Sequence, residues 1–258
     1  MRLIRVKVFV TLLPALVMLA CAGLPPTVGA GHGGLKGDLN VFAAASLTES
    51  FNSLGADFRR AHPAVNLSFV FAGTPTLVTQ ISQGAPADVL ASADAANMQS
   101  AVDLGLVGAP LVFARNRLEI AVGAGNPKRV TGLADLARPD VLFITEAATV
   151  PAGRYAAQAL AAAGVRASPR SFENDVKSVV AKISLGEADA GIVYVTDVRA
   201  AGPKVAGVAI PDAQNVIASY PVAVVRRSHH GAAGTAFIDA LVSAAGQAVM
   251  ARYGFSPP

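Results

Sequence analysis

Apolar and polar residues follow one another along this chain with two periods, one typical of strands and one typical of helices. Residues 40–44 form a short apolar run that predicts a buried strand. From Leu47 to Ala61 the apolar residues recur at helical spacing, which predicts an amphipathic helix. Further strands are predicted at 65–71, 88–91, 118–122, 141–144, 191–195, 205–210 and 220–225, and further helices begin near 75, 94, 151, 176 and 233, the last running to 250. This alternation indicates an α/β fold, with mostly parallel sheets flanked by helices.

The starts of the predicted helices combine hydroxyl groups with free backbone N–H groups. Ser46 follows the first strand, and Thr74 occupies an N-cap position before Pro75. Ala152 and Val176 lie at two later helix starts. The first N–H groups of a helix have no acceptor inside the helix and carry the positive end of its dipole, so they favour an anion.

Tyr194 adds a third hydroxyl at the end of a predicted strand. Hydroxyls and backbone N–H groups are neutral donors, and none of these five positions supplies a positive charge. The pattern therefore suits a small, fully ionised oxyanion held by dipoles. Ser46 also has a simpler interpretation, because Ser46 and Glu49 have the spacing of a capping box, in which the hydroxyl only caps its own helix.

Motifs for catalysis and metal binding are not visible in the sequence. Ser46 lacks the G-x-S-x-G pattern of a nucleophile elbow, and no phosphate-binding G-x-x-x-x-G-K motif is present. His229 and His230 lie in a polar segment that we interpret as a solvated turn. No histidine–carboxylate cluster with metal-ligand spacing is visible. We therefore expect neither an enzyme, nor a cofactor, nor a bare metal ion.

Composition favours a well-packed globular protein. The chain has 258 residues, of which 53% are hydrophobic and 15% charged. The net charge of +4 includes Arg2, Arg5 and Lys7 at the start of the chain, and without them 18 basic residues face 17 acidic ones. Because the remainder contains no Lys/Arg-rich run, we expect no binding to nucleic acid.

The first 37 residues have the pattern of an export signal and a tether. Residues 1–20 combine a basic start with an apolar run that is short for a membrane span. Cys21, the only cysteine, follows this run and resembles the lipidated residue of bacterial lipoproteins, although Met18 stands where such signals usually have Leu. Residues 21–37 would then be a lipidated, flexible N-terminus. In the alternative, Cys21 simply lies within an ordinary signal.

Two predicted strands, those beginning at Leu118 and Tyr220, are the candidates for crossings between two lobes. On this interpretation residues 38–117 plus 220–258 form lobe one, and residues 118–219 form lobe two. Ligands of open α/β sheets bind at the carboxyl ends of strands, so the ligand would lie between the lobes.

Seven short motifs, in one order, resemble a known family. They are Phe42-Ala43-Ala44-Ala45-Ser46-Leu47, Gly84-Ala85-Pro86-Ala87-Asp88, Ser92-Ala93-Asp94, Val150-Pro151-Ala152-Gly153-Arg154-Tyr155, Gly191-Ile192-Val193-Tyr194, Tyr220-Pro221-Val222-Ala223-Val224-Val225 and Arg252-Tyr253-Gly254-Phe255. Together they resemble the molybdate-binding protein of bacterial molybdate ABC transporters, over nearly all of residues 38–255.

This resemblance implies a two-lobed periplasmic-binding-protein fold of type II that closes on molybdate or tungstate. It implies an ABC permease and its ATPase as partners, and an extracytoplasmic protein, here tethered to the cell membrane through Cys21. The implied ligands of the oxyanion are two hydroxyls of lobe one, two backbone N–H groups of lobe two and a tyrosine hydroxyl, which correspond to Ser46, Thr74, Ala152, Val176 and Tyr194. Relatives often have serine at position 74. We expect a monomer.

Two alternatives remain open at this point. The same fold could serve sulfate, phosphate or another small solute. A more remote alternative is a hydrolase that uses Ser46 as its nucleophile.

Overall fold

The computed structural model describes residues 35–258. The predicted signal segment, residues 1–20, and Cys21 lie outside the described residues. The predicted tether overlaps the first strand at its end, because Gly37 already pairs with Val65.

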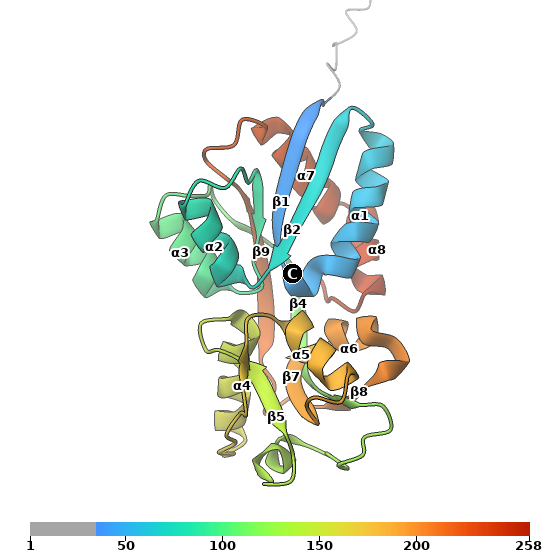
Figure 1. Cartoon of the computed structure of the whole chain (residues 1–258). Helices are drawn as coiled ribbons and strands as arrows, with labels where there is room; N and C mark the ends of the chain where they lie inside the picture. Colours follow the sequence, from blue (N-terminus) through green and yellow to red (C-terminus); the bar gives the residue numbers. More distant parts are fainter. Residues whose placement is uncertain (1–34) are drawn as a thin grey trace, which may run out of the picture. The chain divides into compact units, whose positions relative to one another are not determined.

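The first half of the sheet consists of four strands, here called the first sheet half. They are β1 (Gly37–Ala44), β2 (Val65–Ala72), β3 (Val89–Ala91) and β9 (Ile217–Val224). β1 pairs in parallel with β2 and β3, whereas β9 runs antiparallel to β3. The helices connected to these strands are α1 (Thr48–Ala61), α2 (Thr74–Ser82), α3 (Ala95–Asp103), α7 (Gly231–Val242) and α8 (Ala244–Arg252). Figure 1 shows α2 and α3 on one side of these strands and α1, α7 and α8 on the other.

The second sheet half is built in the same way. Its strands are β5 (Phe143–Glu146), β6 (Phe172–Glu173), β7 (Ala190–Tyr194) and β8 (Val205–Ala209). β5 pairs in parallel with β6 and β7. Its helices are α4 (Pro151–Ala162), α5 (Val176–Ser184) and α6 (Val195–Ala201), and short 3-10 turns cover Ala45–Leu47, Leu133–Ala137 and Gly202–Lys204. The predicted alternation of strands and helices is confirmed. The two-residue strand β6 and the helix α6 were not predicted.

One long strand, β4 (Leu111–Gly123), belongs to both sheet halves. Its residues up to Arg117 pair with β9, and its residues from Leu118 pair with β7 and β8. Only the second part, from Leu118 onward, was predicted from the sequence. The first part escaped prediction because a register shift between Val112 and Ala114 interrupts the alternation of buried and exposed residues.

Aromatic side chains hold α1 against the first sheet half. Phe51 and Phe58 lie one above the other on the apolar face of α1, and both are buried. The ring of Phe237, on α7, contacts both of them edge-on, with centroid distances of 5.7 and 5.5 Å. Edge-to-face packing of this kind suits the quadrupoles of aromatic rings. α1 is thereby fixed along most of its length.

The prediction of one unbroken C-terminal helix is wrong, because Ser243 separates α7 from α8. Its backbone is extended, with φ −61° and ψ 160°, and its hydroxyl accepts a hydrogen bond from Gly246 N. Ser243 is thus the N-cap of α8, and the two helices meet at 65°. Periodicity did not reveal this break, since apolar residues continue on both sides of it.

Within residues 35–258, no single helix combines the length and the apolar composition of a membrane span, and only the bent pair α7–α8 meets both criteria together.

Candidate functional site

A small cavity lies where β1 and β2 end and where three helices begin. Its volume is about 20 Å³. One water molecule needs roughly 10–15 Å³ by this measure, so the cavity has room for a few atoms rather than for a large organic molecule. Its lining residues are Ala44, Ala45, Ser46, Ala72, Gly73, Thr74, Ala93, Val150, Pro151, Ala152, Asp175, Val176 and Tyr194. All five predicted site residues are among them.

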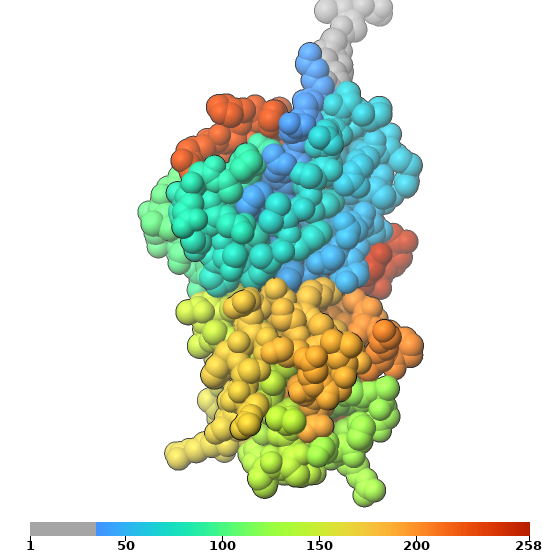
Figure 2. Space-filling view, in the orientation of Figure 1, coloured from blue at the N-terminus to red at the C-terminus, as the bar shows by residue number. Residues whose placement is uncertain are grey.

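The cavity lies between the two sheet halves. Ser46 and Thr74 come from elements of the first half, whereas Ala152, Val176 and Tyr194 come from elements of the second. In Figure 2 the yellow-orange surface around α5 meets the blue and teal surface of α1 and α2. Segments far apart in the sequence therefore form one site.

The first residues of α4 and α5 line the cavity. Ala152 is the second residue of α4, and Val176 is the first residue of α5. Neither N–H group has an acceptor inside its own helix, and each lies at the positive end of a helix dipole. Asp175, the N-cap of α5, accepts a hydrogen bond from Ser178 N at 2.9 Å. The Asp175 carboxylate thus caps the helix through Ser178 N rather than through Val176 N.

The hydroxyl of Ser46 does not cap α1, so the capping-box interpretation is wrong. α1 begins only at Thr48, its N-cap is Leu47, and no side chain caps it. Ser46 lies instead in the 3-10 turn that precedes α1, where its Oγ is 2.9 Å from the hydroxyl of Tyr220. That contact joins residues 174 positions apart, which no local pattern could indicate.

The hydroxyl of Thr74 has a defined role as an acceptor. Thr74 is the first residue of α2 rather than its N-cap, which is Gly73, so the predicted boundary is shifted by one residue. The Oγ1 atom of Thr74 accepts a hydrogen bond from Ala93 N at 3.3 Å. Because a hydroxyl also carries one hydrogen, Thr74 can still donate to an atom in the cavity.

Tyr194 presents a buried hydroxyl to the cavity. Its side chain is 1% exposed, and among the described residues its oxygen has no hydrogen-bond partner. Burial raises the pKa of Tyr194 well above its usual value, so the group stays neutral. An unsatisfied buried hydroxyl costs roughly 1–3 kcal/mol. An acceptor atom in the cavity would remove that cost.

The positive potential at the cavity comes from dipoles rather than from cationic side chains. The residues that line the cavity include no Lys, Arg or His, and the charged residue among them is Asp175. Residues 35–258 contain no cluster of three or more metal-ligating side chains. The arrangement can therefore hold a small anion by neutral donors. It offers Ser46 no histidine as a base, which argues against the hydrolase alternative.

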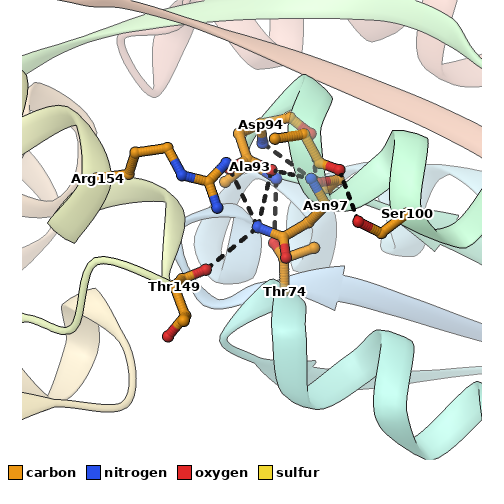
Figure 3. A network of polar contacts seen from close by, with 9 residues as sticks. Thr74, Ala93, Asp94, Asn97, Ser100, Thr149 and Arg154 are labelled. Atoms are coloured by element: carbon orange, nitrogen blue, oxygen red, sulfur yellow. Dashed lines mark hydrogen bonds and ion pairs between the residues drawn. The ribbon is translucent and has the colours of Figure 1, made fainter.

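Ion pairs on either side of the cavity connect the two sheet halves. Arg154, on α4, lies 2.9 Å from the carboxylate of Asp94, the N-cap of α3. Figure 3 shows both residues in one network of polar contacts. On the other side, Lys177 of α5 lies 2.7 Å from Glu49 of α1 and 3.3 Å from Asp197 of α6. Burial lowers the pKa of Lys177, but the carboxylates of Asp197 and Glu49 outweigh it and hold that pKa above its usual value. Sequence patterns did not identify these pairs.

The family of the chain follows from its sequence. The pattern of the family described as bacterial extracellular solute-binding protein matches residues 39–256. The chain belongs to this family. It is an extracytoplasmic solute-binding protein, and the sequence-based expectation of a binding protein rather than an enzyme is confirmed.

Relatives of this solute-binding protein agree with the motifs. The molybdate-binding protein ModA of Mycobacterium tuberculosis is 41% identical over 219 residues, which cover 84% of each chain. The resemblance inferred from the sequence is thereby confirmed. Among solved structures, the periplasmic molybdate-binding protein of Azotobacter vinelandii is similar with a TM-score of 0.71 and 20% identity, over 85% of this chain and 99% of that one. The sulfate-binding protein SubI of M. tuberculosis is similar with a TM-score of 0.77 and 21% identity, over 85% and 86%. These similarities confirm the two-lobed periplasmic-binding-protein fold.

Proposed function

We propose that this protein captures molybdate or tungstate between its two lobes and delivers the oxyanion to an ABC transporter for import. The observation that carries the proposal is the convergence of neutral donors on one small cavity. The donors are the hydroxyls of Ser46, Thr74 and Tyr194 and the backbone N–H groups of Ala152 and Val176. A dianion surrounded by such donors forms charge-assisted hydrogen bonds, which are stronger than neutral ones.

The proposed lobes are residues 38–117 plus 220–258 and residues 118–219. The pairing of β4 supports the first boundary, because its partner changes from β9 to β7 between Arg117 and Leu118. β9 supports the second boundary, since it returns the chain from β8 to the first sheet half. Two strands that pass between the lobes can act as a hinge, and closure would bring the donors of both lobes onto the ligand.

Calorimetric titration of the purified chain with molybdate, tungstate, sulfate and phosphate tests the ligand. Molybdate and tungstate are larger tetrahedra than sulfate, and hydrogen bonds from fixed donors weaken steeply with distance. We expect molybdate and tungstate to bind at least about 100-fold more tightly than sulfate, a difference of about 2.7 kcal/mol. Sulfate binding as tightly as molybdate would contradict the molybdate assignment.

The partners of the proposed function are a permease and its ATPase. A lipid on Cys21 would keep the protein at the cell membrane close to them, as a monomer and without nucleic acid. We expect Cys21→Ser to move the protein from the membrane fraction to the soluble or secreted fraction. Identical partitioning of both proteins, with no lipid found by mass spectrometry, contradicts the anchor.

A further inference from the structure

A chain of buried hydrogen bonds leads from the hinge strands to the cavity. Asn116, on β4, donates from Nδ2 to Thr196 Oγ1 at 2.9 Å and to the hydroxyl of Tyr220 at 3.5 Å. The hydroxyl of Tyr220, on β9, is 2.9 Å from Ser46 Oγ. Asn116, Thr196, Tyr220 and Ser46 are all at most 5% exposed. Solvent therefore has little access to these groups.

The orientation of the Asn116 amide follows from one backbone group. Arg117 N donates to Asn116 Oδ1 at 2.9 Å. Because a backbone N–H can only donate, the amide oxygen of Asn116 must face it and the NH₂ group must face Tyr220. The Tyr220 oxygen accepts from Asn116, and in the contact between Tyr220 and Ser46 either hydroxyl can be the donor. When Tyr220 is the donor, Ser46 Oγ accepts that hydrogen and its own hydrogen is left for the cavity.

We propose that Asn116 and Tyr220 are positioning residues that hold the Ser46 hydroxyl as a donor toward the ligand, and that this polarity favours a fully deprotonated oxyanion over a protonated one. This inference rests on the proposed function. The Thr74 hydroxyl is also available as a donor, because its oxygen accepts a hydrogen bond from Ala93 N and its own hydrogen is left for the cavity. An oxyanion that carries a proton would lose a hydrogen bond wherever its O–H faces one of these donors, and the carboxylate among the lining residues is that of Asp175.

Reversing the polarity of the chain tests the proposal. In Asn116→Asp the carboxylate accepts from Tyr220, so Ser46 must donate to Tyr220 and presents a lone pair to the cavity. We expect molybdate affinity to fall about 10- to 100-fold. Hydrogen phosphate, also a dianion but with one O–H, should lose less, so the ratio of molybdate to hydrogen phosphate affinity should fall. The added negative charge acts on both dianions alike and largely cancels in this ratio.

Tyr220→Phe provides a second, uncharged test. It removes the group that donates to Ser46 while the Ser46 hydroxyl itself remains, and we expect an about 3- to 10-fold loss of molybdate affinity. Asn215→Asp is the matched control, because Asn215 donates to the backbone oxygens of Leu118 and Ile210 and does not line the cavity. That variant should lose thermal stability without changing the affinity ratio.

Calorimetry on the full chain and its three variants separates the outcomes. If the unaltered protein does not bind molybdate, the proposed function fails. If it binds, and both Asn116→Asp and Tyr220→Phe keep its affinity and its ratio, the positioning role is wrong. If Asn116→Asp does not fold, the molybdate affinity of Tyr220→Phe decides the question. An unchanged affinity overturns the proposal, and the expected loss of affinity supports it.

Discussion

Gly73 lies directly against the backbone oxygen of Asn174, so closely that a Cβ atom at position 73 would be 2.3 Å from it. Gly73 precedes α2 in the first sheet half, and Asn174 precedes α5 in the second. The two residues thus meet beside the cavity, where the proposed lobes approach each other. A side chain at position 73 would keep these loops apart.

Gly73→Ala should therefore weaken ligand binding more than it weakens the fold. Because the opposing atom belongs to the backbone, it cannot rotate away as a side chain does, and the lobes would stop short of closure. We expect molybdate affinity to fall at least about 10-fold, or about 1.4 kcal/mol, in calorimetry. Gly132→Ala is the control, since a Cβ there meets no atom within 4 Å and the backbone is extended. Equal affinity of both variants would exclude a role of this contact in closure.

The hydroxyl groups of the site can be tested by pairs of substitutions. Ser46→Ala and Tyr194→Phe each remove one donor to a buried dianion, and each should lower affinity about 10- to 100-fold. Thr74→Ser keeps the hydroxyl and should bind almost normally, whereas Thr74→Val keeps the shape and should lose affinity like Ser46→Ala. The chain contains no Trp, so calorimetry is the appropriate measurement. Unchanged affinity in Ser46→Ala and Thr74→Val together would mean that the site lies elsewhere.

Asp197 should make stability depend on pH. Burial raises the pKa of Asp197 to about 6, although Lys177 opposes this effect. An unfolded Asp has a pKa of about 3.9, so between these two pKa values the folded state binds more protons than the unfolded state. The free energy of unfolding should then fall, through this group, as the pH rises from about 4 to about 6, and should level off above.

Asp197→Asn isolates this contribution, because other titrating groups cancel when the variant is compared with the unaltered protein. The difference in unfolding free energy between the two should change by about 1–3 kcal/mol between pH 4 and pH 7. Urea denaturation at each pH measures it. A difference that does not vary with pH would show that Asp197 does not titrate in this range.

Lys177 should be coupled energetically to Asp197. Lys177→Met leaves the fully buried carboxylate of Asp197 without its cation, which is strongly destabilising for a buried pair. A double-mutant cycle with Asp197→Asn should give a coupling energy of about 1–3 kcal/mol. Lys182→Met is the control on the same helix, because its more exposed pair with Glu173 should be worth less than about 1 kcal/mol. Similar stability losses in both lysine variants would contradict the coupling.

Features that depend on neighbours in sequence were readable from the sequence. The helical spacing around Phe51 and Phe58 predicted the buried face of α1, and the predicted helix start near Val176 is the start of α5, because side chains and caps act within one or two turns. The five residues that line the cavity were named from helix starts and from the family resemblance. Their role as ligands of an oxyanion stays a prediction.

Only the tertiary structure decided the relationships between distant segments. It paired Ser46 with Tyr220 instead of with its own helix, and it placed Gly73 against Asn174. It also extended β4 to Leu111 by pairing with β9. The physical reason is common to all three. A hydroxyl, a glycine or a strand edge can make several local contacts of similar energy. Which contact forms is decided by packing between elements that meet only in the folded chain.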